Sequence, residues 1–289
     1  MIKLKKKVFL HKNKIANFSL SNYNTYLNND SLLIKYYDFE NNWGDTVNPY
    51  LFEKITGKKV VSSNIIYNFL NKTEVLGVGS IISGDLSNYA IWGSGIMWEN
   101  IKINKPKEVL ALRGLKTLKK IQEVGGNCDV FGDPVLLFPE IFSSQNIEKK
   151  YKYGIVPHFK DKNKIGVQKI ANLNDPEIKI IDIQNGIEEF VIDILNCENI
   201  LSSSLHGLIL AEAYGIPTCR LIFSEEMKGG DFKFFDYYSG VGINEMETVV
   251  IHDDISNLKN IFQKCSLKDL KFNSKELKNS IIEFSNRKK

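Results

Sequence analysis

The segment ILSSSLHGLILAEAYGIPTCRLI, residues 200–222, decides the fold class of this chain. It begins at the end of a short apolar run, Ile200–Leu201, and continues into Leu205–Tyr214, which has the length and apolar content of a buried helix. The letters GIP end that helix, and Thr218–Ile222 is again an apolar run of strand length. A strand, a helix and a second strand in this order connect neighbouring strands of a parallel sheet. The segment therefore predicts an α/β fold.

The same alternation of apolar runs and helical patterns recurs along the chain. Further candidate strands are Leu32–Tyr36, Val75–Val78, Ala90–Trp92, Val109–Leu112, Tyr153–Val156 and Ile178–Ile183. Candidate helices are Val47–Thr56, Gly114–Val124 and Ile187–Asn196. Strands that alternate with helices predict parallel sheets covered on both faces. We therefore expect two Rossmann-like domains that face each other across a cleft.

A domain boundary is predicted between the helical stretch Pro134–Phe138 and the end of the polar run Ser143–Lys149. This gives an N-terminal Rossmann-like domain at residues 1–145 and a C-terminal one at residues 146–270. Residues 271–289 are expected to form a final amphipathic helix that packs back onto the body of the protein. Its signals are an Asn273 cap followed by Glu276, and an apolar face of Leu277, Ile281 and Phe284.

Composition excludes several classes of protein. Hydrophobic residues make up 43% of the 289 residues and charged residues 25%, so the chain can build cores and is not disordered. The 38 basic and 34 acidic residues leave a net charge of +4, without the basic stripe of a nucleic-acid-binding protein. The cysteines are widely spaced, at 128, 197, 219 and 265, which is typical of reduced thiols rather than of a disulfide framework.

The amino-terminal stretch Met1–Leu10 is basic and briefly apolar. Lys12 and Lys14 interrupt it before it reaches the apolar length and the cleavage site of a signal peptide. No apolar run approaches the length of a membrane span. A cytoplasmic enzyme is the default expectation.

Polar and small residues follow most of the predicted strands, at the edge where parallel sheets bind ligands. In the first predicted domain they include Asp45, Ser80 and Ser94, and Arg113 directly after Val109–Leu112. In the second they are Pro157-His158 and the run Ser202–Gly207. These residues are the candidate site of the protein.

The run Ser202–Gly207 is the most informative of these. A helix start offers unpaired N–H groups and the positive end of the dipole to a phosphate or carboxylate. Ser202, Ser203 and Ser204 add donors without bulk, and Gly207 lets a ligand approach the backbone. His206 would lie in the first turn, where it can donate to an anion or transfer a proton. The alternative is a serine that only caps the helix and a histidine packed in the core.

Other candidates also have a structural alternative. Arg113 can clamp a carboxylate or phosphate through two parallel hydrogen bonds, or form a surface ion pair. Asp45 suits the N-cap of Val47–Thr56 as well as a ligand, and His158 is a weaker case than His206. Asp133 reads as a turn residue or helix cap, and Glu212 as the polar face of its helix. The aromatic side chains of residues 232–238 could stack on a sugar, but we expect instead that they form a packed helix.

Several familiar motifs are incomplete. Gly77-Val78-Gly79 and Gly93-Ser94-Gly95 lack the third glycine of a dinucleotide site, and Gly57-Lys58 is not a phosphate-binding P-loop. The sequence has no dense cluster of metal ligands, so we expect neither a metal nor a cofactor.

Taken in order, these short motifs resemble the polysaccharide pyruvyl transferase family over roughly residues 32–240. The matching pieces are Asn42-Trp43-Gly44-Asp45, Gly77-Val78-Gly79-Ser80, Trp92-Gly93-Ser94-Gly95, Arg113-Gly114, Gly132-Asp133-Pro134, Pro157-His158 and Ser202–Gly207. The chain departs from the family at Ser204, because many relatives carry an arginine directly before Leu-His-Gly.

The resemblance implies a glycosyltransferase-B-like fold and an enzyme that transfers pyruvate from phosphoenolpyruvate to two hydroxyls of a sugar, forming a ketal. The donor is a substrate rather than a cofactor, and the acceptor is a cell-surface or lipid-linked glycan. By motif, Arg113 and His206 would contact the donor, with His158 as a second histidine in the cleft. Basic residues near both termini suit peripheral contact with the inner face of a membrane carrying the acceptor, although solvated helix faces explain them more simply.

In the resulting hypothesis His206 is the acid–base group, Arg113 clamps the anion and Ser202–Ser204 hold phosphate. Two rival functions remain open from sequence. One is a glycosyltransferase that uses a sugar nucleotide, since fold does not fix the donor. The other is a non-catalytic, glycan-binding relative.

Overall fold

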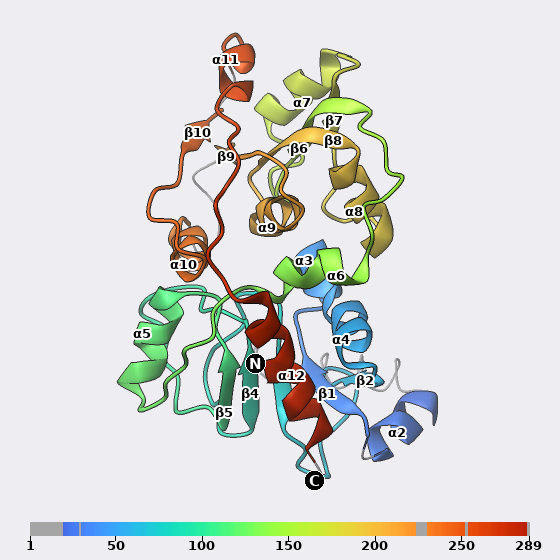
Figure 1. The fold of residues 1–289 in the computed structure, drawn as a ribbon, viewed down its shortest axis with the longest axis vertical. Coiled ribbons are helices and arrows are strands. Elements are labelled where there is room, and N and C mark those ends of the chain that lie inside the picture. Colours follow the sequence, from blue (N-terminus) through green and yellow to red (C-terminus); the bar gives the residue numbers. More distant parts are fainter. Residues whose placement is uncertain (1–19, 29, 224–229, 252–253, 288–289) are drawn as a thin grey trace, which may run out of the picture.

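The protein folds into two lobes, each built on a parallel five-stranded sheet (Figure 1). The computed structural model describes residues 20–28, 30–223, 230–251 and 254–287. The basic stretch Met1–Leu10 and the basic residues at the end of the chain, 288–289, lie outside this range. None of the described helices is both long enough and apolar enough to cross a membrane.

The N-terminal lobe contains the sheet β2-β1-β3-β4-β5, in which every neighbouring pair is parallel. Its strands are β1 (Leu32–Lys35), β2 (Val60–Ser62), β3 (Glu74–Leu76), β4 (Tyr89–Trp92) and β5 (Glu108–Ala111). The helical elements in this part of the chain are α2 (Leu20–Leu27), α3 (Trp43–Thr46), α4 (Asn48–Thr56), α5 (Leu115–Glu123), the 3₁₀ turn η1 (Pro134–Leu137) and α6 (Phe138–Ile141).

The C-terminal lobe contains the sheet β10-β9-β8-β6-β7, also parallel throughout. Its strands are β6 (Tyr151–Val156), β7 (Ile178–Ile180), β8 (Cys197–Ser202), β9 (Thr218–Ile222) and β10 (Thr248–Val250). The helices that follow in the chain are α7 (Ile165–Asn172), α8 (Ile187–Leu195), α9 (Leu205–Ala213), α10 (Phe232–Gly240), α11 (Leu258–Phe262) and α12 (Ser274–Asn286).

The predicted α/β class with parallel sheets is confirmed, and the two sheets are compatible with two Rossmann-like domains. Sequence reasoning missed the outer strands β2 and β10 and the helices α2, α3, α7 and α11. The two missed strands are three residues long, and so short a run has too little periodicity to be recognised.

Helix α12 runs back from the C-terminal lobe and packs on the N-terminal one, against β5, α4 and η1 (Figure 1). The Asn273 side chain accepts a hydrogen bond from the backbone N–H of Glu276, so the predicted cap is confirmed. Leu277 and Ile281 are fully buried, and the Trp92 indole donates to the Leu277 carbonyl over 2.8 Å. The last helix therefore belongs to the packing of the first sheet.

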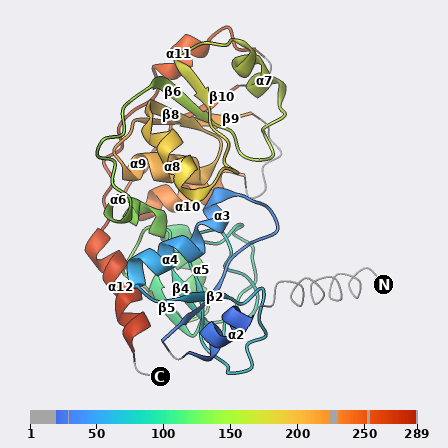
Figure 2. The same cartoon turned by 90° about the vertical axis from the view of Figure 1, so that its right-hand side faces the viewer.

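One buried apolar cluster extends through both lobes, and Trp43 lies where they meet. Its backbone N–H donates to the Ile183 carbonyl over 2.9 Å and its indole N–H to the Ile187 carbonyl over 3.0 Å. Its ring contacts Phe138 and Phe190 at centroid distances of 5.2 and 5.1 Å. The lobes are thus joined by shared packing and not only by the connecting chain. Figure 2 shows α3, the helix that carries Trp43, between the two lobes.

Candidate active site

A cleft of about 250 Å³ lies between the lobes, beyond the carboxyl ends of strands from both sheets. The N-terminal lobe lines it with residues that follow β1, β3 and β4: Tyr37, Glu40, Asn42, Asp45, Gly79, Ser80, Ile81, Met97 and Trp98. The residues on the other side follow β6, β8 and β9: His158, Phe159, Lys160, Ser204, Leu205, His206 and Lys233. Chain topology therefore brings histidines, carboxylates and lysines into one cavity.

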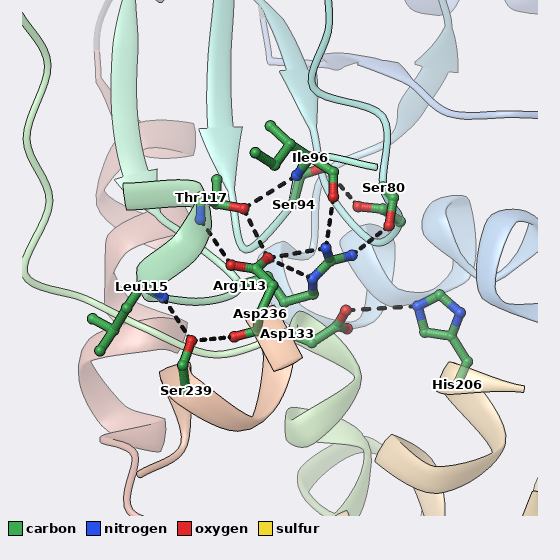
Figure 3. Close-up of polar contacts among 11 residues, drawn as sticks. Ser80, Ser94, Ile96, Arg113, Leu115, Thr117, Asp133, His206, Asp236 and Ser239 are labelled. Atoms are coloured by element: carbon green, nitrogen blue, oxygen red, sulfur yellow. Dashed lines mark hydrogen bonds and ion pairs between the residues drawn. The ribbon is translucent and has the colours of Figure 1, made fainter. Parts of the chain in front are cut away.

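His206 lies in the first turn of α9, 7% exposed, and points toward the buried Asp133 (Figure 3). Its Nε2 is 3.6 Å from Asp133 Oδ2, and neither atom has a hydrogen-bond partner in the described part of the chain. The other carboxylate oxygen, Oδ1, accepts from the Val135 N–H over 3.0 Å, so Asp133 also caps η1 as predicted. A histidine beside a fully buried carboxylate can serve as a proton donor and acceptor, and such pairs tighten when substrate binds.

Gly44 makes room for this histidine. A Cβ placed on residue 44 would lie 1.8 Å from His206 Nδ1, far inside van der Waals contact. The imidazole therefore packs directly on the backbone of the Asn42–Asp45 motif. Residue 44 must be a glycine because the His206 ring, from 162 positions further along the chain, occupies the space of a side chain there.

His158 lines the same cleft as a neutral imidazole. Burial, reinforced by the nearby positive charges of Lys233 and Lys160, lowers the pKa of His158 to about 3. Its Nδ1 accepts a hydrogen bond from the backbone N–H of Lys160 over 3.3 Å, which places the ring proton on Nε2. His158 is thus a neutral hydrogen-bond donor, chemically different from His206.

Asp45 lines the opposite wall and is not the helix cap that sequence allowed. The N-cap residue of α4 is Val47, and Asp45 lies within α3. Asn42 Nδ2 donates to Asp45 Oδ2 over 2.6 Å. Burial raises the pKa of Asp45, while the Asn42 hydrogen bond and the charges of His206 and Lys233 oppose that shift.

Arg113 does not line the cleft. Its side chain is 0% exposed and is held by Asp236 (Nε to Oδ2, 2.9 Å), Ser80 (Nη1 to Oγ, 2.5 Å) and the Ile96 carbonyl (Nη2, 2.9 Å), as Figure 3 shows. This arrangement fits neither the predicted donor clamp nor the surface ion pair. The reason is tertiary, because Asp236 lies on α10, 123 residues further along the chain. Arg113 reaches the cleft only through Ser80, whose hydroxyl it orients.

Of the three serines at 202–204, two stabilise the loop and one lines the cleft. Ser202 Oγ contacts the Val156 carbonyl at 3.0 Å and the Ser204 N–H at 2.9 Å, while Ser203 Oγ donates to Asp161 Oδ2 over 2.7 Å. Both serines are 0% exposed, so they shape the loop and do not line the cleft. Only Ser204, Leu205 and His206 of this run line the cavity.

Two further predicted residues lie behind the cleft wall. A Cβ on Gly207 would lie 2.5 Å from Ser202 Oγ. The absence of a side chain at residue 207 therefore allows the close approach of the Ser202 side chain, not that of a ligand. Ser94 is buried and donates to the Gly79 carbonyl over 2.9 Å. Both residues hold the strand-end loops against each other.

Sequence reasoning missed Lys233, the cleft residue from α10. A signal was present, since Lys233, Asp236 and Ser239 repeat every three residues through an aromatic helix and so share one face. The preferred prediction of a packed helix at 232–238 is confirmed, with Phe234, Tyr237 and Tyr238 buried. Glu212 differs from its predicted solvent-facing role: it is 5% exposed and accepts from Thr218, Tyr237 and Tyr238. No group of histidine, cysteine and acidic side chains in the described ranges is arranged to hold a metal ion.

Comparison with known proteins supplies the family. A family model described as polysaccharide pyruvyl transferase matches residues 89–222. An uncharacterised protein, L143 of Acanthamoeba polyphaga mimivirus, is 32% identical over 220 residues, which cover 73% of this chain and 75% of that protein. The succinoglycan biosynthesis protein ExoV of Rhizobium meliloti (strain 1021) is 25% identical over 211 residues, 70% of this chain and 62% of ExoV.

A crystal structure of an uncharacterised protein from Klebsiella pneumoniae aligns with 86% of this chain and 98% of its own, at a TM-score of 0.45 and 16% identity. The family match includes Arg113, Asp133, His158 and the run Ser202–Gly207, and the relative of 32% identity extends along most of the chain. This protein belongs to the polysaccharide pyruvyl transferase family.

Proposed function

We propose that this protein transfers the pyruvyl group of phosphoenolpyruvate to two hydroxyls of a sugar in a cell-surface or lipid-linked glycan, forming a cyclic ketal. Family membership supports pyruvyl transfer to a glycan. The observation that carries the proposal is the His206–Asp133 pair, in which His206 lines the cleft between the two sheets and Asp133 is buried behind it. The facing sheets and the return of α12 also favour a glycosyltransferase-B-like architecture.

In this mechanism protonated His206 delivers its proton to the methylene carbon of the donor. The adjacent carbon becomes cationic, and a sugar hydroxyl attacks it while the imidazole takes the hydroxyl proton back. Asp133 stabilises the imidazolium form and fixes the orientation of the ring. The second hydroxyl then displaces phosphate, which leaves with the second hydroxyl proton. The bonds and protons balance, and His206 returns to its starting state.

The acceptor sugar has a suitable surface at the mouth of the cleft. Trp98 and Tyr37 both line the cavity and remain 45% and 43% exposed. Exposed aromatic faces suit the C–H face of a sugar, and the Glu40 and Asp45 carboxylates can accept from its hydroxyls. We assign these residues to the acceptor and the His206 side to the donor.

The test is release of inorganic phosphate from phosphoenolpyruvate in the presence of a panel of glycan acceptors, with mass analysis for an added pyruvyl group. His206→Gln should lower kcat by about 10²–10⁴-fold, as loss of a general acid–base does. Asp133→Asn retains an oxygen to cap η1 but loses the charge, so kcat should fall while the protein stays folded. Full activity in His206→Gln would remove the proposed mechanism. Thermal stabilisation by a sugar nucleotide and none by phosphoenolpyruvate would favour a glycosyltransferase instead.

A further inference from the structure

Lys233 is a buried lysine whose charge is not used by the fold. It is the second residue of α10, 9% exposed, and it lines the cleft. In the described part of the chain its ammonium forms no hydrogen bond or ion pair, and its Nζ lies 5.4 Å from the centroid of the Phe234 ring. Burying a charge without a partner is costly. A folded protein keeps such a group where a ligand supplies the missing partner.

The charged groups around Lys233 come from four other parts of the structure. Arg113 at the end of β5 and Arg220 on β9 are positive, while Asp45 on α3 and Asp161 after β6 are negative. Burial, reinforced by the two arginines, lowers the pKa of Lys233 to about 8. His158 and His206 complete the cleft wall on the side of the C-terminal sheet.

The neighbouring carboxylates already have partners. Asp45 accepts from Asn42, and Asp161 accepts from Ser203. Asp236 holds Arg113, and Asp231 holds Arg220. Each of these carboxylates thus has another polar partner, and Lys233 remains available on the cavity side.

The position of Lys233 also favours an anion. It lies in the first turn of a nine-residue helix, where the dipole adds positive potential. Ser204, which lines the same cavity, carries no charge. Apart from His206, whose proton the proposed reaction uses, the positive side chains that line the cleft are the lysines Lys233 and Lys160. Of these, Lys160 is exposed and lies over the Phe159 ring, and Lys233 is the one shielded from solvent.

We propose that Lys233 and the first turn of α10 bind the phosphate group of the donor and hold it as it leaves. This inference rests on the proposed function. It assigns the donor's phosphate to Lys233, which lies outside the motifs quoted above, the last of which is Ser202–Gly207. A shielded ammonium stabilises phosphate before and after the bond to carbon breaks, because the charge on its oxygens persists in the released ion.

The matched test compares Lys233→Met with Lys160→Met, one shielded and one exposed lysine from the same cleft. Calorimetry with inorganic phosphate and with phosphoenolpyruvate should show that Lys233→Met weakens both affinities by about 10–100-fold, the worth of a charge-assisted hydrogen bond. Lys160→Met should change them by less than about threefold, as an exposed charge does. Pyruvate, which lacks phosphate, should bind both variants alike.

Two further measurements exclude a merely structural role. Lys233→Met should raise or preserve the melting temperature, because it removes an unpaired buried charge. Wild-type affinity for phosphate should fall as the pH rises through about 8, where the ammonium loses its proton, and Lys233→Met should lack this decline. A large loss of melting temperature together with unchanged phosphate affinity would overturn the assignment.

The outcomes separate this inference from the proposed function. If the wild-type protein turns over and Lys233→Met keeps its phosphate affinity and its KM for the donor, Lys233 is not the phosphate ligand although the function stands. If Lys233 governs phosphate binding but no acceptor yields a pyruvyl product, the site stands and pyruvyl transfer fails. Absence of phosphate and donor binding in the wild-type protein would overturn both.

Discussion

At the scale of single residues, the cleft depends on where side chains are missing as much as on where they are present. His206 packs on the bare Cα of Gly44, and Gly95 does the same for Arg113, since a Cβ there would lie 2.3 Å from the guanidinium carbon. The two histidines of the cleft have different neighbours. His158 is kept neutral, and His206 faces a buried carboxylate.

Gly44→Ala should displace His206, because the new methyl would lie 1.8 Å from its ring nitrogen. We expect a loss of about 1–3 kcal/mol of stability from overpacking and, from a misplaced acid–base group, a fall in kcat of about 10²-fold. Gly186→Ala is the control, because its Cβ would meet only Glu189 at an ordinary 3.8 Å. Thermal denaturation and phosphate-release assays measure both effects. Wild-type kcat in Gly44→Ala would contradict this packing.

His158 should make stability fall in acid. Its pKa is about 3 in the folded protein against an ordinary 6.5, so only the unfolded chain binds the proton between these values. The free energy of unfolding should therefore decrease as the pH falls below about 6.5, and His158→Asn should show a shallower decrease. Urea denaturation of both proteins at about pH 7 and about pH 4.5 measures the difference in slope. Parallel pH profiles would show that His158 is not buried as a neutral group.

At the scale of secondary structure, α10 lies between the two lobes and packs against α5 (Figure 1). It contributes Lys233 to the cavity, Asp236 to the ion pair with Arg113, and Tyr237 and Tyr238 to the buried Glu212 carboxylate. Asp236 also accepts from the Thr117 N–H and hydroxyl at the start of α5. One helix thus fixes Lys233, the phosphate ligand that we propose, relative to both lobes.

Asp236→Ala should destabilise the protein by about 3–5 kcal/mol, because Arg113 would remain buried without a counter-charge. The double variant Arg113→Met/Asp236→Ala should lose less than the sum of the two single variants, since removing both charges leaves no unpaired ion. Glu123→Ala breaks the exposed Lys120–Glu123 pair on α5 and should cost less than about 1 kcal/mol. Urea denaturation of all four variants gives the coupling energy. Simple additivity would show that the buried pair is not coupled.

At the scale of the whole molecule, the lobes share one apolar core beside the cleft. Trp43 joins them through hydrogen bonds to Ile183, which precedes α8, and to Ile187, the first residue of α8, and its ring contacts Phe138 and Phe190. The return of α12 to the first sheet adds a second connection. The residues that line the cleft from the two lobes are therefore held in place by packing outside the cavity.

We expect the protein to unfold in one cooperative transition, and Trp43→Ala to disrupt that cooperativity. The substitution should cost about 3–5 kcal/mol, as removal of a buried aromatic ring does. Trp98→Ala, at a tryptophan that is 45% exposed, should cost less than about 1 kcal/mol and leave one transition. Calorimetry, with fluorescence and circular dichroism as independent probes, distinguishes these cases. A single unchanged transition in Trp43→Ala would show that the lobes are joined elsewhere.

The sequence by itself determined the local part of this protein: alternating strands and helices, the caps at Asp133 and Asn273, and the histidine at the start of α9. These follow from residues within a few positions of one another, because periodicity and capping are short-range properties. Only the tertiary structure decided which of those residues line the cleft. In the folded protein Arg113 is buried in an ion pair with Asp236 and does not line the cleft. Asp133 lies beside His206, and Lys233 lines the cavity. Each of these outcomes depends on partners tens to more than a hundred residues away, whose approach is set by the packing of the two sheets and not by any local pattern.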